Sequence, residues 1–135
     1  MTEEVQSRGY LLDTHTALFS LWQSKSLSAV AKSAVGEGPN FLSVVAFWEV
    51  TIKSIKGKLD VGDPRLWWQQ ALEQLAATPV PVRPEHVAAL NDLPLVHQDP
   101  FDRILIAQAI VERLALVTRD SDIAQYAVPG LRVVG

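Results

Sequence analysis

The fold of this chain is decided by one stretch, His97-Gln98-Asp99-Pro100-Phe101-Asp102-Arg103-Ile104-Leu105-Ile106-Ala107-Gln108-Ala109. It predicts a helix, because Asp99 can cap the first turn and Pro100 suits the first helical position. From residue 104 to residue 111 nearly every side chain is apolar, so we expect this helix to be buried on most sides. Asp102 and Arg103 stand at its start, one turn before the apolar part. The stretch therefore predicts either a well-capped core helix or one wall of a polar site.

The composition is that of a single folded domain. The chain has 135 residues, 48% of them hydrophobic and 20% charged, and it contains no cysteine. Disulfides, thiolate zinc sites and cysteine nucleophiles are therefore excluded. No apolar run approaches the ~18–20 residues of a membrane span, and the polar N-terminus lacks the apolar part of a signal peptide. We expect a single cytoplasmic domain over residues 1–135, with a loose head over residues 1–8 and no contact with a membrane.

The charge and the motifs narrow the classes of function. The net charge of -3 argues against a protein that coats nucleic acid indiscriminately. It permits a nuclease with an acidic, metal-binding centre and a locally basic rim. Neither a P-loop nor a GxGxxG motif is present, so a nucleotide cofactor is not supported.

Short apolar runs alternate with helical patterns along the chain. The expected strands are residues 10–12, 41–42, 79–82, 114–118 and 131–134. The expected helices follow directly after Asp13 and then span residues 27–35 with Ser26 as cap, 44–56 with Ser43 as cap, 64–75, 84–90, 100–111 and 121–126. This alternation predicts an α/β fold with a mainly parallel central sheet flanked by helices.

Acidic residues stand where such a sheet forms its sites, at the carboxyl ends of the strands. Asp13 ends the first strand, Asp120 and Asp122 follow the fourth, and Asp99 and Asp102 precede it on the central helix. Asp is also a common helix cap. For Asp13, Asp99 and Asp120, capping and lining a site therefore both remain open.

Glu49 has no such alternative, because it lies inside a predicted helix. Its neighbours at three and four positions are Val45, Ala46, Ile52 and Lys53, three of which are apolar. A carboxylate on that flank is costly to bury unless it is paired or bound to a metal. Pairing with Lys53 one turn away and a role in a site are both open.

Taken together, the acids predict metal-assisted hydrolysis. Several carboxylates that converge on one cleft repel one another unless a cation neutralises them. Mg²⁺ and Mn²⁺ are hard ions that prefer oxygen ligands. Such ions retain water, polarise phosphoryl oxygens and help generate a nucleophile, which favours the hydrolysis of a phosphodiester.

The same residues carry a family resemblance. The chain resembles the PIN-domain ribonucleases, specifically the VapC-type toxins of bacterial and archaeal toxin–antitoxin pairs. The matching blocks are Tyr10-Leu11-Leu12-Asp13-Thr14-His15, Phe47-Trp48-Glu49-Val50 with Lys53 and Gly57-Lys58-Leu59, Leu93-Pro94, His97-Gln98-Asp99-Pro100-Phe101-Asp102-Arg103, and Leu116-Val117-Thr118-Arg119-Asp120-Ser121-Asp122. They occur in family order and cover nearly the whole chain from Tyr10. The two last blocks are the specific part of the signal.

The resemblance implies a Rossmann-like three-layer sandwich, the PIN domain. It implies a Mg²⁺- or Mn²⁺-dependent endoribonuclease that acts as a toxin, is usually a homodimer and is held inactive by a cognate antitoxin. By position, the catalytic acids are Asp13, Glu49, Asp102 and Asp120, with Asp122 in reserve for the fourth. Asp13, Asp102 and Asp120 are then the expected metal ligands.

Four further residues are candidates for contact with the RNA. The resemblance places Ser43 before the glutamate helix, and Lys53, Arg103 and Arg119 stand near the acids. Lys53 belongs either to a phosphate-binding rim or to a basic end that complements the helix dipole. The two arginines either grip a phosphate or pair with the neighbouring carboxylates.

Two rival functions follow from the same residues. One is a PIN fold that has lost catalysis and acts by binding a partner. The other is a phosphatase-like hydrolase that uses Asp13, although such an enzyme would need a second Asp where His15 stands.

His15 is a candidate for substrate contact or a structural residue, and His86 is expected at the surface. The adjacent Trp67 and Trp68 cannot both face the core.

Overall fold

A computed structural model describes residues 7–22, 25, 27–95, 99–120, 123 and 128–135. Within them, a parallel sheet runs in the order β3-β2-β1-β4-β5. The strands are β1 (Tyr10–Leu12), β2 (Asn40–Ser43), β3 (Ala77–Val80), β4 (Ala115–Val117) and β5 (Val133–Val134). Every pairing in this sheet is parallel, which confirms the predicted α/β class.

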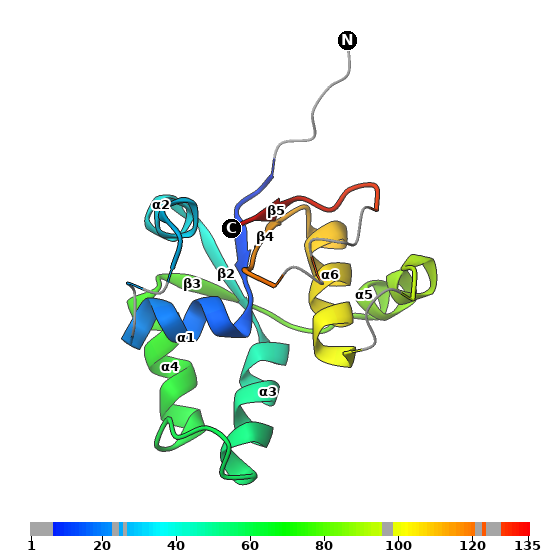
Figure 1. Ribbon diagram of the computed structural model, residues 1–135. Coiled ribbons are helices and arrows are strands. Elements are labelled where there is room, and N and C mark those ends of the chain that lie inside the picture. Colours follow the sequence, from blue (N-terminus) through cyan, green and yellow to red (C-terminus); the bar gives the residue numbers. More distant parts are fainter. Residues whose placement is uncertain (1–6, 23–24, 26, 96–98, 121–122, 124–127) are drawn as a thin grey trace.

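Helices cover both faces of the sheet (Figure 1). They are α1 (Thr14–Trp22), α2 (Ala29–Glu37), α3 (Val44–Ile55), α4 (Pro64–Gln74), α5 (Pro84–Ala89) and α6 (Pro100–Glu112), and a 3₁₀ turn η2 (Leu90–Asp92) follows α5. None of these helices is long and apolar enough to cross a membrane, within the described part of the chain.

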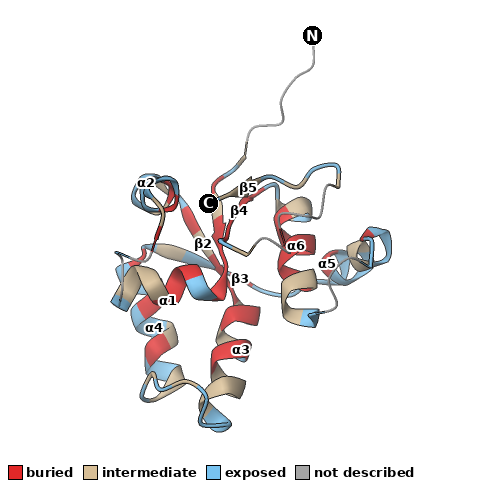
Figure 2. Ribbon diagram, in the orientation of Figure 1, coloured by how far each residue is buried: buried red, intermediate tan, exposed pale blue. Residues whose placement is uncertain are grey.

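The core has two halves, one on each face of the sheet (Figure 2). Leu11 and Leu12 are neighbours on β1 and both are fully buried, yet they belong to different halves. Successive side chains of a strand point to opposite faces, so the central strand supplies both halves. Leu11 packs with α6, and Leu12 packs with α1, α2 and α4. The molecule is therefore the expected three-layer sandwich.

Helix α6 behaves as its sequence predicts. Asp99 caps it, Pro100 takes the first helical position, and the six residues from Ile104 to Ala109 are all buried. The helix ends at Arg113, whose left-handed backbone (φ 55°) stops the hydrogen-bond ladder. Such burial fixes the direction of α6, and with it the place of the acids in its first turn.

Three local predictions are corrected. Helix α2 is capped by Ser28, whose hydroxyl accepts from the Ala31 amide at 3.0 Å, and it runs on past residue 36 to Glu37. The predicted cap Ser26 lies outside the described residues. The edge strand is residues 77–80 and not 79–82, because its pairing with β2 starts at Ala77 opposite Asn40 and ends at Val80 opposite Ser43, the last residue of β2.

The third correction concerns His86, which was expected at the surface and is fully buried. Of the tryptophan pair, Trp67 is buried, whereas Trp68 is partly exposed and stacks on Phe47 with 5.1 Å between ring centroids. That difference confirms that the two rings face different ways. The short helix predicted over residues 121–126 falls almost entirely outside the described residues.

Candidate metal centre

An acidic pocket of about 180 Å³ lies at the carboxyl ends of the central strands. The residues that line it are Asp13, Thr14, His15, Glu49, Lys53, Asp99, Asp102 and Asp120. They come from the start of α1, from α3, from the start of α6 and from the segment after β4, which meet below the sheet in Figure 1. All four predicted catalytic acids are therefore brought to one place.

Asp13 both caps a helix and lines the pocket. Its Oδ1 accepts a hydrogen bond from the Thr16 amide at 2.7 Å, and the residue is 5% exposed. Its own amide donates to the Val117 carbonyl at 3.1 Å, which ties the end of β1 to β4. The two interpretations of this residue are thus compatible, because the cap hydrogen bond uses one carboxylate oxygen.

Glu49 is buried and held by two donors. Thr14 Oγ1 donates to Glu49 Oε1, and Lys53 Nζ pairs with Oε2, both at 2.8 Å. Of the two possibilities left open for Glu49, the pairing with Lys53 is observed, and the pair also lies in the pocket. Sequence reasoning missed Thr14, because only the packing of α1 against α3 brings a residue 35 positions away to Glu49.

The first turn of α6 contributes two acids. Asp99 Oδ1 accepts from the amides of Phe101 at 2.9 Å and Asp102 at 3.3 Å, so Asp99 is the cap. Asp99 also lines the pocket, although it was not in the predicted catalytic set. The sequence already indicated this position, because a residue that caps the helix one turn before Asp102 must lie at the same helix end.

Asp120 reaches the pocket from the loop after β4. Its amide donates to Thr118 Oγ1 at 3.0 Å, which helps turn the chain there. The reserve candidate Asp122 lies outside the described residues. Asp120 is thus the described acid that this loop supplies.

The lining suits a hydrated hard cation. Five carboxylates and one ammonium group face the same small pocket. Among the described residues, no group of three or more acids or histidines is arranged to hold a metal ion by itself. Mg²⁺ tolerates such a site, because it retains several waters and needs only one or two carboxylates. The donor set therefore fits Mg²⁺ or Mn²⁺ bound partly through water.

Only one of the four candidate RNA-contacting residues, all of them described by the structure, lines the acidic pocket. Lys53 lines the pocket, whereas the described lining does not include Ser43, Arg103 or Arg119. Ser43 is fully buried and caps α3 by accepting from the Val45 amide at 3.0 Å. The Arg103 guanidinium donates to the Pro94 carbonyl at 2.9 Å and to those of Leu90 and Leu93. Arg119 is exposed.

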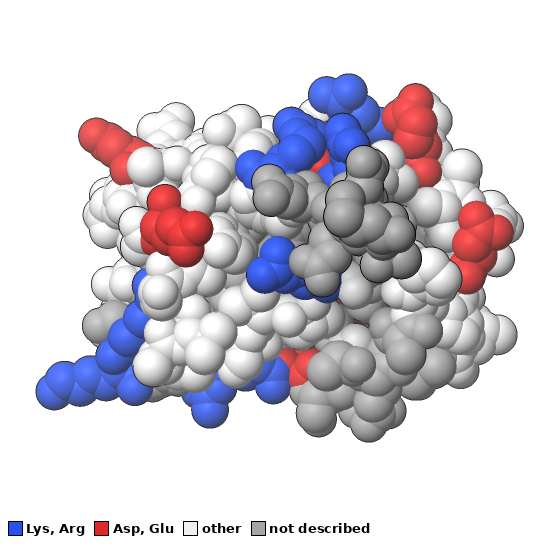
Figure 3. All heavy atoms as spheres, turned by 90° about the horizontal axis from the view of Figure 1, so that it is seen from above, with Lys and Arg blue, Asp and Glu red and all other residues white. Residues whose placement is uncertain are grey.

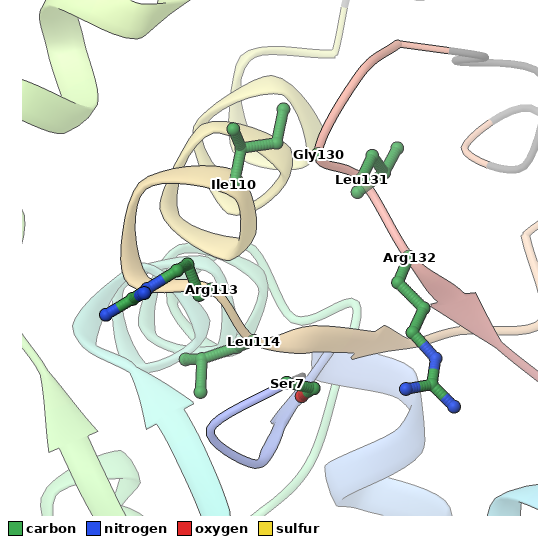
Figure 4. A pocket seen from close by; sticks show the side chains of 7 residues that line it. All are labelled: Ser7, Ile110, Arg113, Leu114, Gly130, Leu131 and Arg132. Atoms are coloured by element: carbon green, nitrogen blue, oxygen red, sulfur yellow. The ribbon is translucent and has the colours of Figure 1, made fainter. Parts of the chain in front are cut away.

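A larger cavity of about 660 Å³ lies near the amino ends of β1, β4 and β5 (Figure 4). Its lining is Ser7, Ile110, Arg113, Leu114, Gly130, Leu131 and Arg132. Seen from above, Lys and Arg side chains lie in several separate groups, with Asp and Glu side chains among them (Figure 3). The side chains of Arg113 and Arg132 point in different directions in Figure 4. Among the described residues, the lining of this cavity therefore includes neither the carboxylates nor the converging cations of a site for phosphodiester chemistry.

The parallel sheet and the carboxylate pocket at its carboxyl edge define the class of fold. The PIN domain family matches the chain over residues 10–129, so the chain belongs to the PIN domain family.

Known proteins that resemble the chain agree with this assignment. It is 27% identical over 121 residues to the protein named ribonuclease VapC22 of Mycobacterium tuberculosis, covering 88% of this chain and 92% of that one. Its fold matches VapBC2 from Rickettsia felis bound to a promoter DNA fragment, with a TM-score of 0.65, 14% identity and coverage of 92% and 96%. It also matches a toxin–antitoxin complex from Klebsiella pneumoniae, with a TM-score of 0.60, 22% identity and coverage of 91% and 95%.

Proposed function

We propose that the chain is a Mg²⁺- or Mn²⁺-dependent endoribonuclease that acts as the toxin of a toxin–antitoxin pair. The observation that carries this proposal is the pocket that gathers Asp13, Glu49, Asp102 and Asp120 at the carboxyl edge of a PIN fold. The similarity to a protein named a ribonuclease and to toxin–antitoxin complexes supports it.

We assign parts in the proposed reaction to five of the residues that line the pocket. Asp13, Asp102 and Asp120 would hold the cation, which would supply Lewis-acid stabilisation of the phosphoryl oxygens. Glu49 faces the pocket with both oxygens fixed by Thr14 and Lys53, so it orients the attacking water and takes up its proton. Lys53 places a positive charge beside the scissile phosphate.

The toxin role also requires protein contacts, and exposed apolar side chains are available for them. Trp48 on α3 is 60% exposed, Ile55 at the end of that helix 79%, and Leu66 on α4 58%. Large exposed apolar side chains are typical of protein interfaces. We propose that the cognate antitoxin and a second copy of the chain bind to surfaces of this kind.

A catalytically silent binding module is the second candidate. It is favoured by one observation: Glu49 already has two donors in the protein, so its burial does not require a metal. In that case the acidic pocket would be a structural remnant.

Cleavage of RNA by the purified chain separates the two candidates. We expect wild-type protein to cut RNA with Mg²⁺ or Mn²⁺ and to stop in EDTA. Asp13→Asn should abolish cleavage while keeping the helix cap, since Asn caps nearly as well as Asp. The matched control is Asp92→Asn, which changes an exposed acid of η2 outside the pocket lining.

Three results are informative. Metal-dependent cleavage that Asp13→Asn abolishes and Asp92→Asn retains would support the ribonuclease. No cleavage of total tRNA, rRNA or mRNA, together with no Mn²⁺ binding by calorimetry, would support the binding module. Tight Mn²⁺ binding without cleavage would point to a narrow RNA substrate outside those pools.

A further inference from the structure

Helix α1 carries three aromatic rings along one side. His15, Phe19 and Trp22 follow one another at spacings of four and three residues, which places them on one side of the helix. His15 and Trp22 are exposed, with Trp22 at 52%, and Phe19 is half-buried. The buried residues of the helix are Thr14, Thr16, Ala17 and Leu18. Phe19 also packs against the part of the core on this face of the sheet. We call the rings of His15, Phe19 and Trp22 the α1 stripe.

The α1 stripe begins at the acidic pocket. His15 is one of the residues that line the pocket, whereas Phe19 and Trp22 lie one and two turns further along the helix. The rings of His15 and Phe19 have centroids 6.1 Å apart and planes tilted by 31°. A flexible ligand that reaches the pocket along α1 therefore passes successive aromatic rings.

His15 also has free hydrogen-bonding capacity. Within the described residues, its ring makes an aromatic contact with Phe19 but no hydrogen bond or ion pair. The other described histidine, His86, is buried, and its ring nitrogens contact the Arg83 amide and the Glu112 carboxylate at 2.9 Å each. The position of His15 is thus not explained by a folding role of the kind that His86 has.

Charge favours stacking over phosphate contact on this surface. Helix α1 (THTALFSLW) contains no Lys, Arg, Asp or Glu, and the adjoining pocket holds five carboxylates. The phosphates of an RNA strand gain nothing from such a helix, so another interaction must hold the strand there. Base stacking on aromatic side chains meets that need, because every base has a π-face.

We infer that the α1 stripe binds unpaired RNA bases next to the scissile phosphate. This inference rests on the proposed ribonuclease function and adds the residues that select the conformation of the RNA. Trp22 and Phe19 stack on bases of the strand, and His15 contacts the nucleotide nearest the pocket. A base-paired strand hides its base faces, so the α1 stripe selects single-stranded segments.

The test is RNA binding without cleavage. In an Asp102→Asn background, a labelled single-stranded oligoribonucleotide is titrated by fluorescence anisotropy, and the same sequence is titrated as a duplex. Trp22→Ala should weaken binding of the single strand on the order of ten-fold and leave duplex binding unchanged. His15→Ala and Phe19→Leu test the other two rings, and thermal unfolding checks that each variant is folded.

Val87→Ala is the surface control, because Val87 is 52% exposed on α5, outside both the α1 stripe and the lining of the acidic pocket. Equal affinities of wild-type and Trp22→Ala protein would overturn the inference, and so would equal losses in the Trp22 and Val87 variants. The inference would also be overturned if Trp22→Ala bound RNA like wild type but sedimented as a monomer where wild type is a dimer. That result would show that the α1 stripe is a contact between two copies of the chain.

The experiments can contradict the ribonuclease proposal and the stacking inference independently of each other. If wild-type protein binds the single strand through Trp22 but cuts no RNA, the ribonuclease is wrong and the stacking surface stands. If it cuts RNA and Trp22→Ala has the KM and kcat of wild type, the stacking inference is wrong and the ribonuclease stands.

Discussion

Lys53 Nζ lies 2.8 Å from Glu49 Oε2, one turn away on α3, and both side chains line the acidic pocket. The pair supplies a positive charge where the surrounding carboxylates repel one another. A divalent cation that entered the pocket beside Asp13, Asp102 and Asp120 would be repelled by that ammonium group. Lys53 therefore competes with the metal.

Removing this competitor should strengthen metal binding. Lys53→Met is expected to bind Mn²⁺ about five-fold more tightly, because a partly exposed charge pair is worth about 1 kcal/mol. Calorimetric titration with Mn²⁺ measures the change. Lys56→Met, which alters an exposed lysine at the end of α3, should bind like wild type. Unchanged or weaker binding in Lys53→Met would show that Lys53 does not compete for the site.

Asp99 should show two separable effects, one on stability and one on the metal. Asp99→Ala removes the cap of α6 and should lower the free energy of unfolding by about 1 kcal/mol, whereas Asp99→Asn retains the cap and should cost much less. Both variants remove one negative charge from the pocket, so both should weaken Mn²⁺ binding to a similar extent. Urea unfolding and calorimetry separate the effects. Wild-type Mn²⁺ affinity in Asp99→Asn would rule out a contribution of the Asp99 charge.

Thr14 should stabilise the fold through Glu49. Thr14→Val removes the hydroxyl group that donates a hydrogen bond to Glu49 Oε1. The expected cost is about 1.5–3 kcal/mol, the range for hydrogen bonds to charged groups. Thr14→Ser keeps the donor and should cost less. Thr51→Val is the control, since that hydroxyl donates to the neutral Phe47 carbonyl at 2.7 Å. Equal urea midpoints for the two valine variants would contradict a special role of Thr14.

The stability that the contact between α5 and α6 provides should depend on pH. His86 Nδ1 accepts from the Arg83 amide, so Nε2 carries the proton and donates to Glu112 Oε2 at 2.9 Å. This hydrogen bond, helped by the charges of Arg83 and Arg8, holds the pKa of Glu112 below its ordinary value of 4.5, and burial opposes it.

A carboxyl group whose pKa is lowered by folding adds stability above its unfolded pKa and loses it as the pH falls through the folded pKa. We therefore expect the Glu112 contribution to be complete at neutral pH and to disappear below pH 4.5. Glu112→Gln should be less stable than wild type at neutral pH, and the difference should shrink towards about pH 3. Urea unfolding across this range measures it. A difference that does not change with pH would show that ionised Glu112 adds nothing.

Much of the candidate site could be predicted from the sequence, and the reason is local. Asp13 and Asp120 follow short apolar runs, and Asp99 and Asp102 begin a helix whose body is apolar. Parallel strands end at the same edge of their sheet, so acids that follow strands or begin helices meet there. Alternation of apolar runs and helical patterns was therefore enough to place these carboxylates together.

The contacts between distant segments could not be predicted in this way. Thr14 meets Glu49, His86 meets Glu112, and the Arg103 guanidinium turns to the carbonyls of residues 90, 93 and 94 instead of the pocket. Spacing along the chain says which face of a helix a residue occupies, but not which neighbour that face meets.

The sequence by itself thus determined the parallel α/β fold, the buried central helix and the edge of the sheet where the acids lie. Tertiary structure alone decided which donors hold Glu49, that His86 is buried against Glu112, and that the rings of α1 lead away from the pocket. The physical reason is that hydrophobic periodicity and helix caps are set within a few residues, whereas these contacts depend on how helices from separate parts of the chain pack on the sheet.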